Sequence, residues 1–263
     1  MPTDRMIAQK DGVIGWMTFN NPARHNAMSI DMWAGVSEIM ASFEADPDVR
    51  VIVLKGAGEK SFVSGADISQ FEKMRATKDD IAHYDSVAHA ANMALTNATK
   101  PTIAMIRGYC IGGGLGVALR CDLRIVADDS QFGIPAAKLG LGYGYPGAKL
   151  LTDIVGPAIA KDIFFTARRM DSTEALRIGL VNHVVPVDKL ESFTRDYAAM
   201  ISQNAPLTVR TAKLAVNAAT HDSPDPAELA AVQVAVDACY ASEDYKEGRL
   251  AFAEKRKPVF RGA

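Results

Sequence analysis

Short apolar runs of strand length recur along the first half of the chain, separated by turn residues and by longer amphipathic stretches. These runs are rich in β-branched residues, which favours strands. They cover residues 13–20, 49–56, 101–107 and 122–127. The first run ends at Asn20-Asn21-Pro22, a turn signal. Because strands alternate with helical stretches, the pattern predicts an α/β core built from repeated ββα units.

Helical periodicity appears between these runs and dominates the last third of the chain. Residues 29–44 carry apolar side chains at spacings of three and four, with Ser29 in the position of an N-cap. Residues 79–96 also read as a helix. From residue 157 onward the strand signal fades, and helices are expected over residues 158–166, 172–178, 190–203, 207–219 and 225–240. We therefore expect residues 1–200 to form the core and residues 201–263 a helical C-terminal region.

Composition excludes several classes of protein. The chain has 263 residues, of which 48% are hydrophobic and 23% charged, which is an ordinary globular composition. Its net charge of -2 gives no general attraction to nucleic acid or to an anionic membrane surface. The longest uncharged stretch, near residues 86–99, is too short and too polar to span a bilayer. We therefore expect neither a nucleic acid nor a membrane as a partner.

The cysteines and the N-terminus indicate a compartment. Cys110, Cys121 and Cys239 show no spacing typical of a metal site, so no metal is expected. An odd and sparse set of cysteines in a chain of this length indicates reducing, cytoplasmic surroundings. The first residues mix acidic and basic side chains and lack an apolar stretch, which argues against a signal peptide.

Three segments have a composition suited to a ligand site. In residues 61–69, the small pair Gly65-Ala66 precedes Asp67, which suits either close approach of a ligand or a turn capped by Asp67. In residues 108–116, three consecutive glycines at a helix start suit either binding of negative charge or close packing. Residues 131–147 hold five glycines, two prolines and two tyrosines, as functional loops and ordinary surface loops both do.

Taken together, these segments resemble the enoyl-CoA hydratase/isomerase (crotonase) superfamily over nearly the whole chain. The residues that carry the resemblance are Asn20-Asn21-Pro22, His25-Asn26-Ala27-Met28, Ser61-Phe62, Gly65-Ala66-Asp67-Ile68, Gly112-Gly113-Gly114, Cys121-Asp122-Leu123, Phe132-Gly133-Ile134-Pro135, Leu139-Gly140, Gly179-Leu180-Val181 and Phe252 to Pro258. The resemblance implies the crotonase (ClpP/crotonase-like) fold, with a C-terminal region that forms a homotrimer or a dimer of trimers.

The resemblance also implies a lyase or isomerase of fatty acid metabolism, with an acyl-CoA thioester as substrate and no further cofactor. The N–H groups of Ala66 and Gly113 match the two donors that bind the thioester oxygen in this family. Donors fixed in advance beside a developing oxyanion contribute about 3–4 kcal/mol each. Contacts to CoA are implied at Ala23, Arg24, Ala27, Ser64, Ile68, Phe252 and Lys255. By charge alone, Arg24 and Lys255 would be ordinary surface residues.

The chain departs from the family at two positions. Family hydratases use one glutamate two residues past the triple glycine and another directly after the proline of Phe-Gly-x-Pro. Gly116 and Ala136 stand there, and neither can hold a water or transfer a proton. Decarboxylation, isomerisation or thioester hydrolysis is therefore favoured over standard hydration, although a name given by homology would be enoyl-CoA hydratase. Tyr143 matches a tyrosine of decarboxylase-type members and is the first catalytic candidate. Tyr145 is the second, and packing explains both equally well.

Some residues and functions stay open. Arg120 interrupts an apolar stretch, either to pair with a carboxylate or to extend its charge toward solvent. His83 and His89 fall in the helix that lines the acyl pocket in this family, yet a lone helical histidine is commonly structural. A catalytically silent acyl-CoA-binding protein would carry the same residues. A ClpP-like serine peptidase is a further alternative, but no nucleophile-elbow pattern surrounds Ser61 or Ser64, and no motif places a histidine partner.

Overall fold

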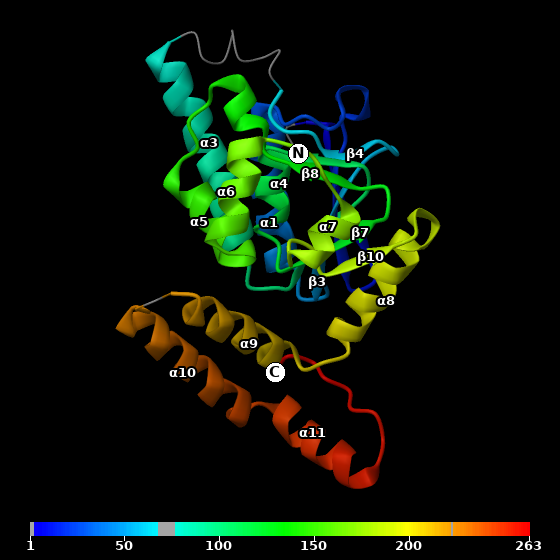
Figure 1. Cartoon of the computed structure of the whole chain (residues 1–263). Helices are drawn as coiled ribbons and strands as arrows, with labels where there is room; N and C mark the ends of the chain where they lie inside the picture. Colours follow the sequence, from blue (N-terminus) through cyan, green and yellow to red (C-terminus); the bar gives the residue numbers. More distant parts are fainter. Residues whose placement is uncertain (1–2, 68–76, 222) are drawn as a thin grey trace.

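A computed structural model describes residues 3–67, 77–221 and 223–263. It contains two β-sheets flanked by helices, with a further group of helices below them (Figure 1). The larger sheet has six strands in the order β1-β2-β3-β5-β7-β10. Its first pair is antiparallel and all later neighbours are parallel. The strands are β1 (Met6–Asp11), β2 (Ile14–Phe19), β3 (Val51–Gly56), β5 (Thr102–Ile106), β7 (Leu123–Ala127) and β10 (His183–Val185).

The smaller sheet has four short strands in the order β4-β6-β8-β9, of which the first three are parallel. They are β4 (Ser61–Val63), β6 (Tyr109–Ile111), β8 (Gln131–Gly133) and β9 (Met170–Asp171). Strands β3, β5 and β7 of the larger sheet are each followed along the chain by β4, β6 and β8 of the smaller one. Because a helix comes after each pair, the chain repeats a ββα unit, which confirms the predicted fold class.

The helices cover both faces of the larger sheet. Val51 and Val53 of β3 contact the apolar residues of α8, whereas Ile52 and Leu54 join the cluster formed with α1. This alternation is the two-residue period of a strand buried on both faces. The helices are α1 (Ile30–Ala45), α3 (Lys78–Thr96), α4 (Gly113–Ala118), α5 (Tyr145–Val155), α6 (Pro157–Thr166), α7 (Ser172–Arg177), α8 (Leu190–Ser202), α9 (Pro206–Ala219), α10 (Pro226–Ala241) and α11 (Glu243–Glu254).

Several details differ from the expectation. Helix α1 begins after Ser29 as predicted, but the Ser29 hydroxyl donates to the Asp31 carboxylate and makes no capping bond to the backbone. The strand signal does not end at residue 157, because β9 and β10 follow it. The predicted glycine-rich segment 131–147 is not one loop: it holds β8, the 3-10 helix η3 (Pro135–Leu139) and the start of α5.

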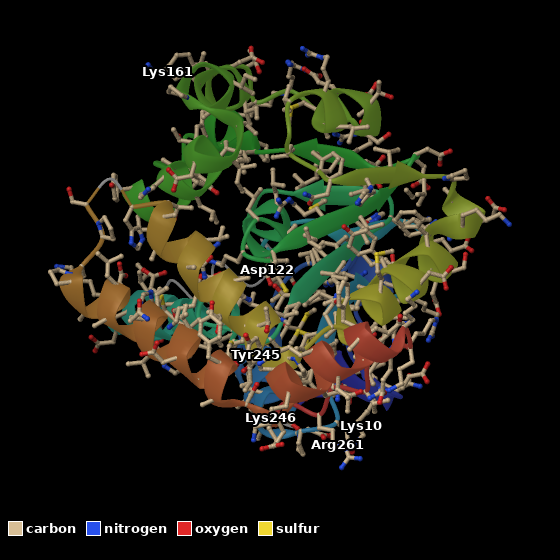
Figure 2. All side chains as sticks on the ribbon, turned by 90° about the horizontal axis from the view of Figure 1, so that it is seen from below. Lys10, Asp122, Lys161, Tyr245, Lys246 and Arg261 are labelled. Atoms are coloured by element: carbon tan, nitrogen blue, oxygen red, sulfur yellow. The ribbon has the colours of Figure 1, made fainter. Side chains whose placement is uncertain are left out.

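The C-terminal helices α9, α10 and α11 lie together below the core (Figure 1). Seen from below, they cross this end of the molecule, with Tyr245 and Lys246 on α11 (Figure 2). The Lys213 ammonium of α9 pairs with the Asp122 carboxylate of the core at 2.8 Å. The division at residue 200 stays a prediction.

Within the described residues, no helix has the length and apolar character needed to cross a membrane. The same part of the chain contains no group of three or more His, Cys, Asp or Glu side chains arranged to hold a metal ion.

Candidate active site

Ala66 presents a backbone N–H group beside the smaller sheet. Met28 N donates to Gly65 O at 2.8 Å, and Asp67 N donates to Met28 O at 2.9 Å. These two bonds form a parallel bridge between Met28 and Ala66. In such a bridge, the bonds flank the central residue and its own N–H points away from the partner. The Ala66 N–H makes no hydrogen bond to the residues that the structure describes, so it is available to a ligand.

Gly113 brings a second N–H group to the same place. It is the first residue of α4, where N–H groups have no partner within the helix. A Cβ placed on Gly113 would lie 3.9 Å from the Ala66 nitrogen, so the two residues are neighbours. Gly112, at φ 56° and ψ -118°, turns the chain into the helix. Gly114 packs so closely that a Cβ there would lie 2.0 Å from Val63 O.

One face of α4 stays open next to these groups. In α4, Gly113 is exposed and Gly116 is half-buried, and Arg120, in the turn after the helix, is also half-buried. The residues between them are buried: Gly114, Leu115, Val117, Ala118 and Leu119. Arg120 Nη1 donates to Gly116 O at 2.7 Å. A Cβ placed on Gly116 would lie 3.5 Å from that nitrogen. The guanidinium therefore covers the surface of α4 at Gly116.

Ala136 and Tyr143 lie in the segment that follows β8. Ala136, in η3, is half-buried against the apolar core. The Tyr143 ring packs on Phe164 of α6, with the ring centres 4.8 Å apart. Burial raises the pKa of the Tyr143 phenol, and the nearby Arg120 guanidinium acts in the opposite direction. The phenol is protonated at neutral pH, so it can donate a hydrogen bond, and the side chain is 40% exposed. Tyr145 is 77% exposed at the start of α5.

Most of the residues that the resemblance implies as CoA contacts lie close to Ala66 in the structure. The 3-10 helix η1 (Pro22–Arg24) carries the exposed Ala23 and Arg24, and Ala27 is buried just after it. Ser64 N donates to His25 O at 3.1 Å, which joins this segment to the end of β4. Arg24 Nη1 lies 3.3 Å from the buried Asp67 carboxylate.

Two predicted contacts are not brought to this place, and a third is not described. Ile68 lies outside the described residues. Phe252 is exposed on α11 and Lys255 ends that helix, and Figure 1 shows α11 at the opposite end of the molecule from β4. A single chain therefore does not place these two side chains beside Ala66.

A family model described as enoyl-CoA hydratase/isomerase matches residues 9–263. The chain belongs to the enoyl-CoA hydratase/isomerase family. A short-chain-enoyl-CoA hydratase from Clostridium acetobutylicum is 36% identical over 257 residues, covering 98% of this chain and 97% of that protein. An (E)-benzylidenesuccinyl-CoA hydratase from Thauera aromatica is 36% identical over 250 residues, covering 95% and 96%.

A solved structure confirms the crotonase fold of this family member. The crystal structure of an enoyl-CoA hydratase/carnithine racemase from Magnetospirillum magneticum matches with a TM-score of 0.91 and 36% identity. The match covers 99% of this chain and 97% of that one. The family and fold predicted from the motifs are therefore both confirmed.

The structure also shows a contact that no motif of the family indicated. His25 Nδ1 lies 3.1 Å from Ser61 Oγ, across 36 positions of sequence. Ser61 is only 3% exposed, and no carboxylate in the described part of the chain hydrogen-bonds to His25. The contact joins β4 to the segment after β2, and its buried hydroxyl gives no support to a peptidase.

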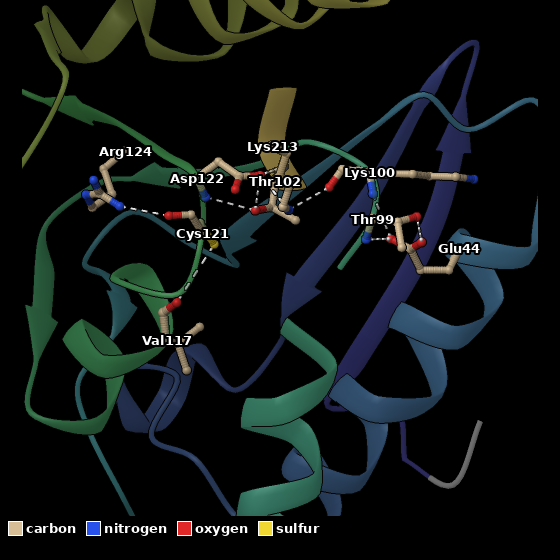
Figure 3. Close-up of polar contacts among 9 residues, drawn as sticks. All are labelled: Glu44, Thr99, Lys100, Thr102, Val117, Cys121, Asp122, Arg124 and Lys213. Atoms are coloured by element: carbon tan, nitrogen blue, oxygen red, sulfur yellow. Dashed lines mark hydrogen bonds and ion pairs between the residues drawn. The ribbon is translucent and has the colours of Figure 1, made fainter. Parts of the chain in front are cut away.

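The remaining candidates have simpler surroundings. His83 and His89 are exposed on α3, away from the buried residues of that helix, which are Tyr84, Ala91 and Leu95. Asp122 accepts hydrogen bonds from Thr102 N at 2.7 Å and Thr102 Oγ1 at 2.9 Å, in addition to its ion pair with Lys213 (Figure 3). Asp122 therefore links β5 to α9, through hydrogen bonds to Thr102 and an ion pair with Lys213.

Proposed function

We propose that this family member acts on an acyl-CoA thioester and stabilises an enolate-like oxyanion with the N–H groups of Ala66 and Gly113. The observation that carries the proposal is the juxtaposition of these two donors, each without a partner among the described residues. Such donors are fixed by the backbone before the substrate binds, so they need no reorganisation when charge develops on the carbonyl oxygen. The dipole of α4 adds partial positive charge at its N-terminal end, where Gly113 lies.

The reaction that we propose is not hydration driven by two glutamates. Gly116 and Ala136 offer no titratable group. Decarboxylation, isomerisation and thioester hydrolysis all place negative charge on the thioester oxygen, and so all fit the two donors. Tyr143 is the proposed proton donor or orienting group, because its ring is fixed against Phe164 and its phenol is near Arg120. The enzyme would accordingly be a lyase, isomerase or hydrolase that needs no metal and no cofactor besides the CoA of its substrate.

The CoA part is proposed to lie against Ala23, Arg24, Ala27 and Ser64. Phe252 and Lys255 would then contact a CoA bound to another copy of the chain in a trimer. The family does not fix the acyl group. The names of the two relatives above describe acyl groups as different as a short enoyl chain and benzylidenesuccinate.

Crotonyl-CoA hydration tests the proposal. We expect turnover at least 100-fold below that of a family hydratase that carries both glutamates, since general acid–base groups contribute about 10²–10⁴-fold. For a thioester that is converted, Tyr143→Phe should lower kcat by at least tenfold, while Tyr145→Phe, which removes an exposed hydroxyl, leaves it unchanged. Hydration within tenfold of the reference enzyme, unaffected by Tyr143→Phe, would contradict the proposal.

One observation favours a second candidate, an acyl-CoA-binding protein without catalysis. Gly116 and Ala136, at the two positions of the family's glutamates, cannot transfer protons, so binding could persist where chemistry was lost. A panel of acyl-CoAs, followed by calorimetry and by mass spectrometry of the thioesters, separates the two candidates. Binding of a thioester without any product identifies the silent protein, whereas any converted thioester identifies an enzyme.

A further inference from the structure

Arg120 holds a positive charge in a partly desolvated place, with no negative partner among the residues that the structure describes. Its guanidinium has five donor hydrogens, and the single hydrogen bond it makes to the described residues goes to Gly116 O. No carboxylate of residues 3–67, 77–221 or 223–263 forms an ion pair with it. Burial lowers the pKa of Arg120. Arginine nevertheless stays protonated.

A second arginine nearby shows what a purely structural role looks like in this fold. Arg124 is 6% exposed and donates to the carbonyls of Leu180 at 2.7 Å and Cys121 at 2.8 Å, with Ala118 at 3.5 Å. Its charge is spread over several backbone oxygens, which satisfies a buried guanidinium. Arg120 has one such oxygen within the described part of the chain, which leaves its other donors for water or a ligand.

The position of Arg120 points to the ligand. Gly113 and Gly116 lie on the open face of α4, and Arg120, in the turn that follows this helix, reaches back to donate to Gly116 O. Gly116 follows Gly113 by one turn of α4, a rise of about 4.5 Å. The guanidinium lies against Gly116, so it is next to the helical turn that begins at the Gly113 N–H. An acyl group whose thioester oxygen is held by that N–H and which extends along α4 would bring its far end to the guanidinium.

We propose that Arg120 binds a carboxylate on the acyl group, so that the substrates are CoA thioesters of dicarboxylic acids. This inference rests on the proposed function, because it takes the Gly113 N–H as the anchor of the thioester. A guanidinium binds a carboxylate through two parallel charge-assisted hydrogen bonds, and this geometry selects it over a methyl group. Arg120 is thus a specificity-determining residue.

Binding of a matched ligand pair tests this inference without relying on turnover. Glutaryl-CoA and pentanoyl-CoA have the same number of acyl carbons and differ in a terminal carboxylate or methyl group. By calorimetry, we expect the wild-type chain to bind glutaryl-CoA at least tenfold more tightly. Arg120→Met should bring the ratio of the two dissociation constants close to one. Gly116→Glu should do the same, since its carboxylate would meet the guanidinium from a Cβ position 3.5 Å away.

Lys138→Ala is the matched control, because it removes a positive charge from an exposed position of η3 and should leave the ratio unchanged. Equal binding of the two ligands by the wild type, or a ratio that survives Arg120→Met, overturns the inference and leaves the proposed function standing. If Arg120→Met weakens both ligands equally, the arginine binds a phosphate of CoA, and the inference is again wrong. Failure of both ligands to bind the wild type contradicts the proposed function as well.

Discussion

At the residue scale, the two cysteines buried in the core should resist alkylation. Cys110 and Cys121 are buried, and burial raises the pKa of both, that of Cys121 to about 12. The thiolate is the reactive form, and a pKa of about 12 leaves on the order of one thiolate in ten thousand at pH 8.

We therefore expect a pulse of iodoacetamide at pH 8 to leave Cys110 and Cys121 of the folded protein unmodified. Peptide mass spectrometry reads out the three sites separately, and the protein unfolded in urea, where all three should react, is the control. Labelling of Cys110 or Cys121 in the folded protein at the rate seen in urea would show that the core opens readily.

Single residues also show where sequence reasoning succeeds and where it stops. That Ala66 and Gly113 lie side by side could be predicted from the motifs of the family, and the structure places them as neighbours, while their role stays a proposal. The surroundings of Arg120 could not be predicted, because an arginine in an apolar stretch can either pair with a carboxylate or extend its charge toward solvent. The contact between His25 and Ser61 spans 36 positions and depends on tertiary packing alone.

At the scale of elements, α9 is held to the core by one buried polar cluster. Lys213 Nζ donates to Asp122 Oδ2 at 2.8 Å and to Lys100 O at 3.0 Å, and its side chain is 11% exposed (Figure 3). Lys213→Met should lower the free energy of unfolding by about 1–3 kcal/mol, because it leaves part of a charged hydrogen-bond cluster unsatisfied. The melting temperature should fall by about 2–4 °C per kcal/mol.

The same substitution at an exposed lysine is the control. Lys161→Met on α6 removes an equal charge and should change the melting temperature little (Figure 2). Amide hydrogen exchange should rise in α9 of the Lys213 variant and stay unchanged in α6. A Lys213 variant as stable as the Lys161 variant would mean that apolar packing alone docks α9.

The elements that the pattern predicted well are those with long periodic stretches, such as α1, α3 and α10, whose ends fall within a residue or two of expectation. Short elements were harder. The three residues of β10 carry too little pattern to stand out, and become a strand by pairing with β7. Helix α5 begins at Tyr145-Pro146 inside a turn-rich segment, where a proline in the first turn is compatible with a helix. No helix was predicted over the residues of α11, of which only the last few were noted, as part of a family motif.

At the scale of the whole molecule, the C-terminal helices expose an unusual amount of apolar surface. Val216 of α9, Val234 of α10 and Phe252 of α11 are 63%, 69% and 87% exposed. A groove of about 710 Å³ lies among the same helices and is lined largely by apolar side chains, including Val236, Tyr240, Tyr245, Phe252 and Phe260. Soluble monomers seldom expose such patches together. With the family's trimers as the precedent, we infer that further copies of this chain cover them.

Light scattering after gel filtration tests this inference. The wild-type chain should have about three or six times the 28.2 kDa mass of one copy. Val234→Glu places a charge in the proposed interface and should shift the protein to a smaller species, since a buried unpaired carboxylate costs several kcal/mol. Ser192→Glu adds the same charge at an exposed position of α8 and should leave the mass unchanged. A wild-type protein that runs as a monomer at micromolar concentration would refute the trimer, and would leave Phe252 and Lys255 without a CoA to contact.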